Sequence, residues 1–313
     1  MNTYVTPTNH TNDLHTDSDR LWQALMEMAK LGATPKGGVN RQALTDLERQ
    51  GRDLFIQWCR AEGCTIRIDN IGNIFARREG SDPNAKTVMA GSHLDSQPTG
   101  GKYDGCFGVM AGLEVIRTLN EHKITTQAPI EVVAWTNEEG CRFAPCMMGS
   151  GVFSGVLEFD AMMARTDAEG VTVSDALDAI HYRGSDEVSP SEIKAYFEPH
   201  IEQGPILEDT DTTIGVVIGG LGQKWFDLTL TGLEAHAGPT PMNLRRDAMM
   251  GAAEVTQALN RIAFDHQPHG RGTVGCMTLP PGSRNVIPGQ VKMTLDMRHW
   301  EPKALETMGQ AVS

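Results

Sequence analysis

The sequence contains no long apolar run. None of its segments approaches the roughly 18 consecutive apolar residues that a membrane-spanning helix needs. Its polar start, MNTYVTPTNHTNDLHTDSD, also lacks the basic and apolar regions of a secretory signal peptide. We therefore expect a soluble, cytoplasmic protein without a membrane partner.

Basic residues are few relative to acidic ones. The 313 residues include 27 Lys and Arg against 40 Asp and Glu, so the formal net charge is −13. Proteins that bind nucleic acids through the phosphates carry an excess of positive charge. The composition therefore argues against a nucleic-acid partner.

The cysteines form no CxxC pair, which is the spacing common to zinc and thiol–disulfide motifs. Some of them lie inside apolar or Gly-rich segments, so we expect free thiols in a reducing compartment. The six residues are Cys59, Cys64, Cys106, Cys141, Cys146 and Cys276.

The chain does contain enough apolar sequence for a core. A hydrophobic fraction of 40%, with 33 Gly and 16 Pro, is typical of a folded α/β protein. At about 150 residues per domain, the length suggests roughly two domains.

Helical and strand-like patterns alternate in the first part of the chain. After a loose tail over residues 1–16, Asp17 offers an N-cap to a helix that runs to about Ala29. The alternation predicts a mixed sheet layered between helices. The other expected elements are helices at 44–58 and 107–119, and strands at 65–68, 73–76, 87–90 and 130–135.

The pattern changes to α+β near residue 212, so we expect a domain boundary close to Asp211. One domain would cover residues 1–211 and a smaller one residues 212–313. The expected elements of the second are strands at 214–218 and 225–230, a helix at 244–262, and strands at 273–277 and 291–297.

Chemically active side chains gather first in the segment GSHLDSQPTGGKYDG. His93 and Asp95 are two residues apart at the end of a predicted strand, so both side chains point to the same side. One could bind a metal ion while the Asp95 carboxylate accepts the second ring N–H of His93. Asp104 follows a Gly-Gly turn at a loop-to-helix junction. A strand-end His with two solvated Asp residues is the plain structural alternative.

Two further segments bring polar side chains to predicted strand ends. Glu138 and Glu139 directly follow an apolar strand, where one acid could bind a cation and its neighbour accept a proton. The strand at Tyr196 and Phe197 is followed by His200 and Gln203. Surface acids and a core histidine bound to a carbonyl are the alternatives.

Polar motifs also occur in the second domain, at EAHAGPTP, SRNVIP and DMRH. They contain His236, Asn285 and Arg298. Arg298 is suited to bidentate capture of a carboxylate, and Asn285 to a second hydrogen bond. Taken singly, these are also ordinary loop polar groups.

Together these segments resemble a known family. The strings GSHLDSQPTGGKYDG, TNEEGCRF, EPHIEQG, HAGPTPM, RNVIPG and DMRH are similar to the amidohydrolase branch of the M20 metallopeptidases. This branch includes N-carbamoyl-L-amino-acid hydrolase, β-ureidopropionase and allantoate amidohydrolase. The resemblance implies a zinc-peptidase-like catalytic domain with a smaller α+β lid and dimerisation domain.

The resemblance also implies roles for individual residues. Two divalent metal ions would be held, with Asp104 bridging them; zinc is the default, and manganese, cobalt or nickel fit the same ligands. Glu138 would be the general base, Asp95 would support His93, and His236 would stabilise the oxyanion. The implied metal ligands are His93, Asp104, Glu139 and His200, and the implied substrate-binding residues are Gln203, His236, Asn285 and Arg298.

One departure from the family concerns the C-terminal part of the catalytic domain. The family supplies a last metal-binding His after the lid, whereas this chain ends at Ser313 within the lid pattern. We therefore expect a part of a longer protein, in which Asp104 and Glu139 alone would hold the second ion poorly.

The expected function is hydrolysis of the carbamoyl C–N bond of N-carbamoyl amino acids, of the L-α or β-alanine type, by a cytoplasmic homodimer. The products would be the amino acid, ammonia and carbon dioxide. Allantoate amidohydrolase is the main alternative and a peptidase a weaker one, and an inactive binding or dimerisation module is the alternative outside enzymes.

Overall fold

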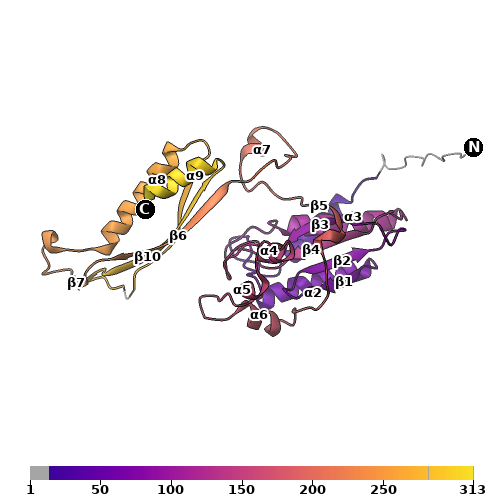
Figure 1. Cartoon of the computed structure of the whole chain (residues 1–313), viewed down its shortest axis with the longest axis horizontal. Helices are drawn as coiled ribbons and strands as arrows, with labels where there is room; N and C mark the ends of the chain where they lie inside the picture. Colours follow the sequence, from indigo (N-terminus) through magenta and orange to yellow (C-terminus); the bar gives the residue numbers. More distant parts are fainter. Residues whose placement is uncertain (1–13, 281, 313) are drawn as a thin grey trace, which may run out of the picture. The chain divides into compact units, whose positions relative to one another are not determined.

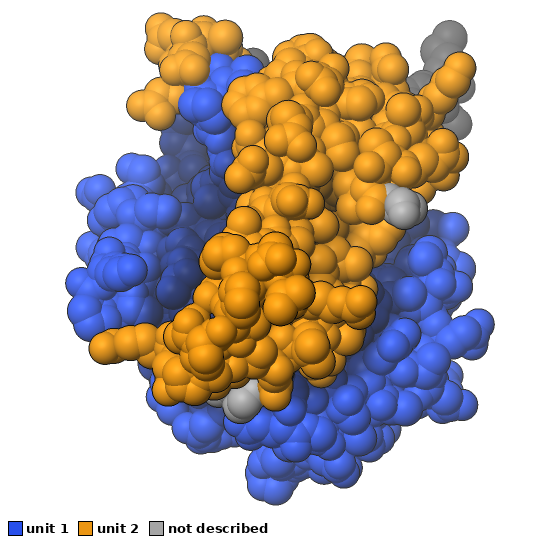
Figure 2. Space-filling view, turned by 90° about the vertical axis from the view of Figure 1, so that its left-hand side faces the viewer, with its two compact units in different colours: residues 1–206 blue, residues 207–313 orange. Residues whose placement is uncertain are grey.

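The computed structural model describes residues 14–280 and 282–312, so the tail predicted over residues 1–16 lies mostly outside the described residues. The chain divides into two compact units, Met1–Ile206 and Leu207–Ser313, which Figure 2 colours separately. The sequence places this boundary slightly later, near Asp211. Each unit is described by itself below.

Unit 1 is an α/β unit whose strands form one sheet (Figure 1). Its helices are α1 (Ser18–Met28), α2 (Asp46–Ala61), α3 (Cys106–Glu121), α4 (Met148–Phe153), α5 (Phe159–Met163), α6 (Val173–Ala179) and the first residue of α7 (Ile206–Asp209), with a 3₁₀ turn at Pro190–Glu192. Its strands are β1 (Thr65–Ile68), β2 (Ile74–Arg78), β3 (Thr87–His93), β4 (Ile130–Trp135) and β5 (Ile193–Phe197).

The first helix begins and packs as its sequence indicates. The Asp17 side chain accepts a hydrogen bond from the backbone N–H of Arg20, which satisfies one of the unpaired donors at the start of α1. Leu25 and Met28, one turn apart, are both buried in the core of unit 1. The helix predicted from Asp17 to about Ala29 is therefore confirmed.

The sheet of unit 1 is mixed, as the sequence predicts. Its strand order is β1-β2-β4-β3-β5; β4 and β5 run parallel to β3, whereas β1, β2 and β4 are joined by antiparallel ladders. His93 at the end of β3 lies opposite Trp135 at the end of β4. Because β3, β4 and β5 point the same way, the segments that follow them leave from the same edge of the sheet.

Alternate side chains of the strands pack on opposite faces of this sheet. Ala76 and Val132 belong to the large core that also contains residues of α1, α2 and α3. Phe75 and Val133 belong to a smaller cluster on the other face, with Met89. Burial on both faces makes the sheet a stable platform for the side chains at its edge.

Unit 2 is an α+β unit (Figure 1). Helices α8 and α9 pack against the antiparallel sheet β6-β10-β8. The core of this unit includes Leu259, Met293 and Met308. The short strands β7 and β9 pair separately. The bounds are β6 (Gly222–Thr231), β7 (Ala235–His236), α8 (Ala248–Asp265), β8 (Arg271–Thr278), β9 (Val286–Ile287), β10 (Gln290–His299) and α9 (Pro302–Val312), with most of α7 and a 3₁₀ turn at Met242–Leu244.

The strand predicted at residues 214–218 is wrong. This segment has no regular secondary structure, and Ile214, Val216 and Ile218 are between 80% and 96% exposed. An apolar, β-branched run becomes a strand only where another strand accepts its backbone hydrogen bonds. No described strand pairs with this segment.

Over the part of the chain that the structure describes, no helix is both long and apolar enough to cross a membrane. The described residues include all six cysteines, and none of them forms a disulfide. Their expected redox compartment stays a prediction.

A buried ion pair in α2 contacts Thr136, the residue that follows β4. Arg52 donates to the Glu48 carboxylate at 2.5 Å, and its guanidinium also donates to Gly72 O at 2.6 Å and to Thr136 Oγ1 at 3.2 Å. Both charged side chains are almost completely buried. Burial raises the pKa of the Glu48 carboxyl, an effect that the Arg52 charge opposes.

We predict that Arg52→Met destabilises the protein strongly, because it leaves Glu48 buried without its counter-charge. The free energy of unfolding should fall by about 3–5 kcal/mol in urea titrations. The matched control is Arg49→Met in the same helix, whose ion pairs with Asp46 and Asp53 are exposed. The control should lose much less stability, and equal losses for the two variants would contradict the prediction.

Candidate metal centre

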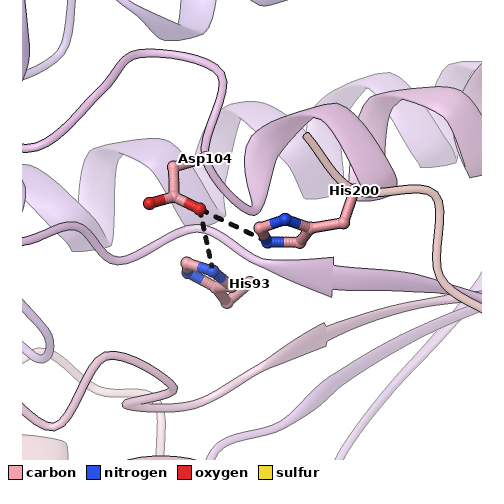
Figure 3. A group of neighbouring side chains, drawn as sticks. All are labelled: His93, Asp104 and His200. Atoms are coloured by element: carbon pink, nitrogen blue, oxygen red, sulfur yellow. Dashed lines mark ion pairs between the residues drawn. The ribbon is translucent and has the colours of Figure 1, made fainter. Parts of the chain in front are cut away.

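The structure brings three of the predicted ligands together at the sheet edge of unit 1 (Figure 3). One ligand atom each of His93, Asp104 and His200 lies within 4.8 Å of the other two. Asp104 Oδ1 is 3.3 Å from His200 Nε2 and 3.9 Å from His93 Nε2. His93 and Asp104 are buried, whereas His200 is exposed.

Three different elements position these side chains. His93 is the last residue of β3, and His200 follows the end of β5. Asp104 precedes α3, whose N-cap residue Gly105 has a φ of +64°. A Cβ atom at this glycine would lie 2.5 Å from the His93 ring, so the close approach of loop and imidazole requires glycine.

Both imidazoles present the same nitrogen to Asp104. His93 Nδ1 is 2.9 Å from the backbone oxygen of Asp95, and His200 Nδ1 is 2.9 Å from that of Ile201. A carbonyl only accepts hydrogen bonds, so each Nδ1 carries a proton, and in the neutral imidazole each Nε2 then keeps a lone pair. Lone pairs that face a carboxylate are the arrangement expected of metal ligands.

Asp95 supports His93 in a different way from the one predicted. Its backbone carbonyl, and not its carboxylate, pairs with His93 Nδ1, and the nearest carboxylate oxygen lies 3.7 Å away. The carboxylate instead accepts the backbone N–H groups of Glu138 at 3.1 Å and of Glu139 at 3.2 Å. Asp95 therefore connects the segment after β3 to the turn after β4.

The two adjacent glutamates occupy different surroundings. Glu138 Oε2 is 3.3 Å from His93 Nε2. Glu139 Oε2 accepts a hydrogen bond from Gln97 at 3.1 Å, whereas its Oε1 is buried and has no hydrogen-bond partner among the described residues. Burial raises the pKa of both carboxyl groups, and neighbouring acids such as Asp95 and Asp104 add to this.

The donor set of this site fits divalent cations. Imidazole nitrogens and carboxylate oxygens are common ligands of zinc and also suit manganese, cobalt and nickel. The buried, unpaired oxygen of Glu139 adds a donor that a cation would satisfy. Glu139 is not part of the three-residue cluster itself, so its role as a ligand stays a prediction, as do the roles of the other site residues.

The predicted substrate-binding residues are divided between the two units. In unit 1, Gln203 donates to Asp104 Oδ2 at 2.5 Å. In unit 2, the backbone N–H of Ala237 donates to the backbone oxygen of Asn285, which brings His236 and Asn285 to neighbouring positions. The Arg298 guanidinium forms an ion pair with Asp296 at 2.7 Å. Their contribution to one common site stays a prediction.

Gln97 is a contact of the site that sequence reasoning missed. It lies within the GSHLDSQPTGG segment, but a single amide in a loop carries no spacing or charge signal that points to a role. Its contact with Glu139 depends on the fold alone.

Comparisons with known proteins show which family the chain resembles. Residues 89–302 match the model of peptidase family M20/M25/M40. An N-carbamoyl-L-amino-acid amidohydrolase of Rhizobium meliloti is 49% identical over 292 residues, which covers 93% of this chain and 70% of the relative. One from Geobacillus stearothermophilus is 41% identical over 304 residues, which covers 94% and 73%.

A solved structure shows the same likeness. The crystal structure of an amidase of the hydantoinase/carbamoylase family from Burkholderia vietnamiensis has 53% sequence identity and a TM-score of 0.92, over 96% of this chain and 73% of that one. The chain therefore belongs to peptidase family M20/M25/M40, in the group that includes the amidases of the hydantoinase/carbamoylase family.

Proposed function

We propose that this protein is a metal-dependent amidohydrolase that cleaves the carbamoyl C–N bond of N-carbamoyl-L-amino acids. The products would be the amino acid, ammonia and carbon dioxide. The observation that carries the proposal is the cluster of His93, Asp104 and His200, with Glu138 Oε2 3.3 Å from the imidazole of His93. The names of the relatives favour carbamoyl amino acids over allantoate and peptides.

The cluster, together with Glu139, would hold the metal ions. His93, Asp104 and His200 would bind one ion, and Asp104 and Glu139 a second, with zinc as the first metal to test. Divalent cations bound here would supply Lewis-acid chemistry, polarising the carbamoyl oxygen and making water more acidic.

Glu138 would move the proton during the reaction. Its carboxylate would accept the proton of the attacking water and pass it to the leaving nitrogen. Burial raises the pKa of this carboxyl above its ordinary value, so it holds a transferred proton more readily than an exposed glutamate does. The backbone N–H of Glu138 is held by the Asp95 carboxylate, which keeps the base beside His93.

The substrate would be oriented mainly by residues of unit 2. Arg298, with Asn285 and Gln203, would bind the substrate carboxylate, because a guanidinium can donate two parallel hydrogen bonds to it. His236 would donate to the oxyanion.

The homodimer through residues 212–313 and the cytoplasmic location also stay predictions.

The first test is product release as a function of metal. Purified protein should release ammonia from N-carbamoyl-L-amino acids, lose this activity on dialysis against a chelator, and regain it with zinc or manganese. Metal content per chain is measured in parallel, and N-carbamoyl-D-amino acids and allantoate serve as comparison substrates. A protein that holds two metal ions per chain but releases no ammonia from any carbamoyl or ureido acid would contradict the proposal.

The second test separates the roles of the two glutamates. Glu138→Gln removes the proton acceptor but no proposed ligand, so kcat should fall by about 100- to 10,000-fold while metal content is unchanged. Glu139→Gln should instead reduce the metal content. Wild-type turnover in Glu138→Gln would remove this residue from the mechanism.

A further inference from the structure

A second set of polar side chains lies at the ends of β3, β4 and β5, next to the candidate metal centre. It takes no part in the chemistry described above. The Glu198 carboxylate accepts hydrogen bonds from Ser92 Oγ at 2.6 Å and from the Tyr196 hydroxyl at 2.6 Å. Trp135 Nε1 donates to the oxygen of Tyr196 at 2.9 Å. We call these four residues the Glu198 network.

The network joins the three strands whose ends carry the site. Ser92 directly precedes His93 on β3, and Trp135 is the last residue of β4. Tyr196 belongs to β5, and Glu198 lies two residues before His200. Each member is thus close in sequence to a residue that the proposed chemistry uses.

The backbone ladder alone does not hold the segment that carries His200. The pairing of β5 with β3 ends at Phe197, opposite Ala90, whereas β3 continues to His93. Beyond this point, the hydrogen bond between Ser92 and Glu198 continues the connection through side chains. This hydrogen bond joins the residue before His93 to the residue two positions before His200.

The protonation of the network follows from its donors and acceptors. The indole N–H of Trp135 can only donate, so the Tyr196 oxygen accepts from it and directs its own proton to Glu198, the nearer of its two acceptors. Partial burial of Tyr196, which is 40% exposed, and then the Glu198 charge raise the pKa of its hydroxyl, which keeps the hydroxyl protonated. Two donors to one carboxylate favour a single orientation of the exposed Glu198 side chain.

We propose that Glu198 is a positioning residue, which fixes His200 relative to His93 by anchoring the segment after β5 to Ser92 and Tyr196. The proposal rests on the metal site of the proposed function, but not on its substrate. Groups that orient a metal ligand matter for its affinity, and losing a direct hydrogen-bond partner weakens metal binding by about 10- to 100-fold. Glu198 contacts neither imidazole and acts through the backbone that carries His200.

The experiment measures metal affinity without any substrate. Zinc is titrated into metal-free protein in competition with a chromophoric chelator, for the wild type and for Glu198→Ala. We expect the variant to bind zinc about 10- to 100-fold more weakly. Glu198→Gln keeps an oxygen that can accept from Ser92, so it should recover part of the loss. The matched control is Glu187→Ala, which removes an exposed carboxylate of the same unit and should leave the affinity unchanged.

A double variant tests whether Ser92 and Glu198 act together. If they do, Ser92→Ala combined with Glu198→Ala should bind zinc about as weakly as Glu198→Ala alone. A Glu198→Ala protein with a lower urea midpoint but wild-type zinc affinity would show a purely structural role and overturn the proposal. A wild-type protein that binds zinc but hydrolyses no carbamoyl substrate would overturn the proposed function and leave this inference standing.

Discussion

The parallel alignment of β3 with β4 and β5 is the constraint on which the site depends. It brings His93, the Glu138–Glu139 pair and His200, which are far apart in the sequence, to one edge of one sheet. The ladder between β3 and β4 is buried on both faces, so the ends of these two strands have little freedom to move apart, whereas β5 is a largely exposed edge strand. Backbone hydrogen bonds thus set the spacing between His93 and the glutamate pair, and the Ser92–Glu198 hydrogen bond continues the connection towards His200.

This alignment also concentrates negative charge. The carboxylates of Asp95, Asp104 and Glu138 lie between 3.3 and 3.9 Å from nitrogen atoms of His93. Burial with repulsion from neighbouring acids raises the pKa of Glu138 and Glu139. Like charges held this close destabilise a fold unless cations or hydrogen bonds compensate them. Asp95 is compensated by two backbone N–H groups, whereas the unpaired oxygen of Glu139 is the place where compensation is incomplete.

Sequence reasoning succeeded where the determining interactions are local. Asp17 and the spacing of Leu25 and Met28 define α1 because caps and helical periodicity act within a few residues. It failed at residues 214–218, because a strand depends on a partner that periodicity does not reveal. The same limit applies to the site. The spacing in the sequence indicates the residues near His93, whereas the proximity of His200 to Asp104 is implied only by the family resemblance. The hydrogen-bond partner of His93 Nδ1 depends on the path of the turn, which the sequence does not reveal.

The glycine at the start of α3 has a consequence for redesign of this site. The His93 ring occupies the space where any side chain at position 105 would begin, and the backbone there is left-handed. Sequence libraries that vary residues 101–103 must therefore keep Gly105 constant, together with the proposed ligand Asp104. At position 105, a single added carbon atom would collide with the His93 imidazole.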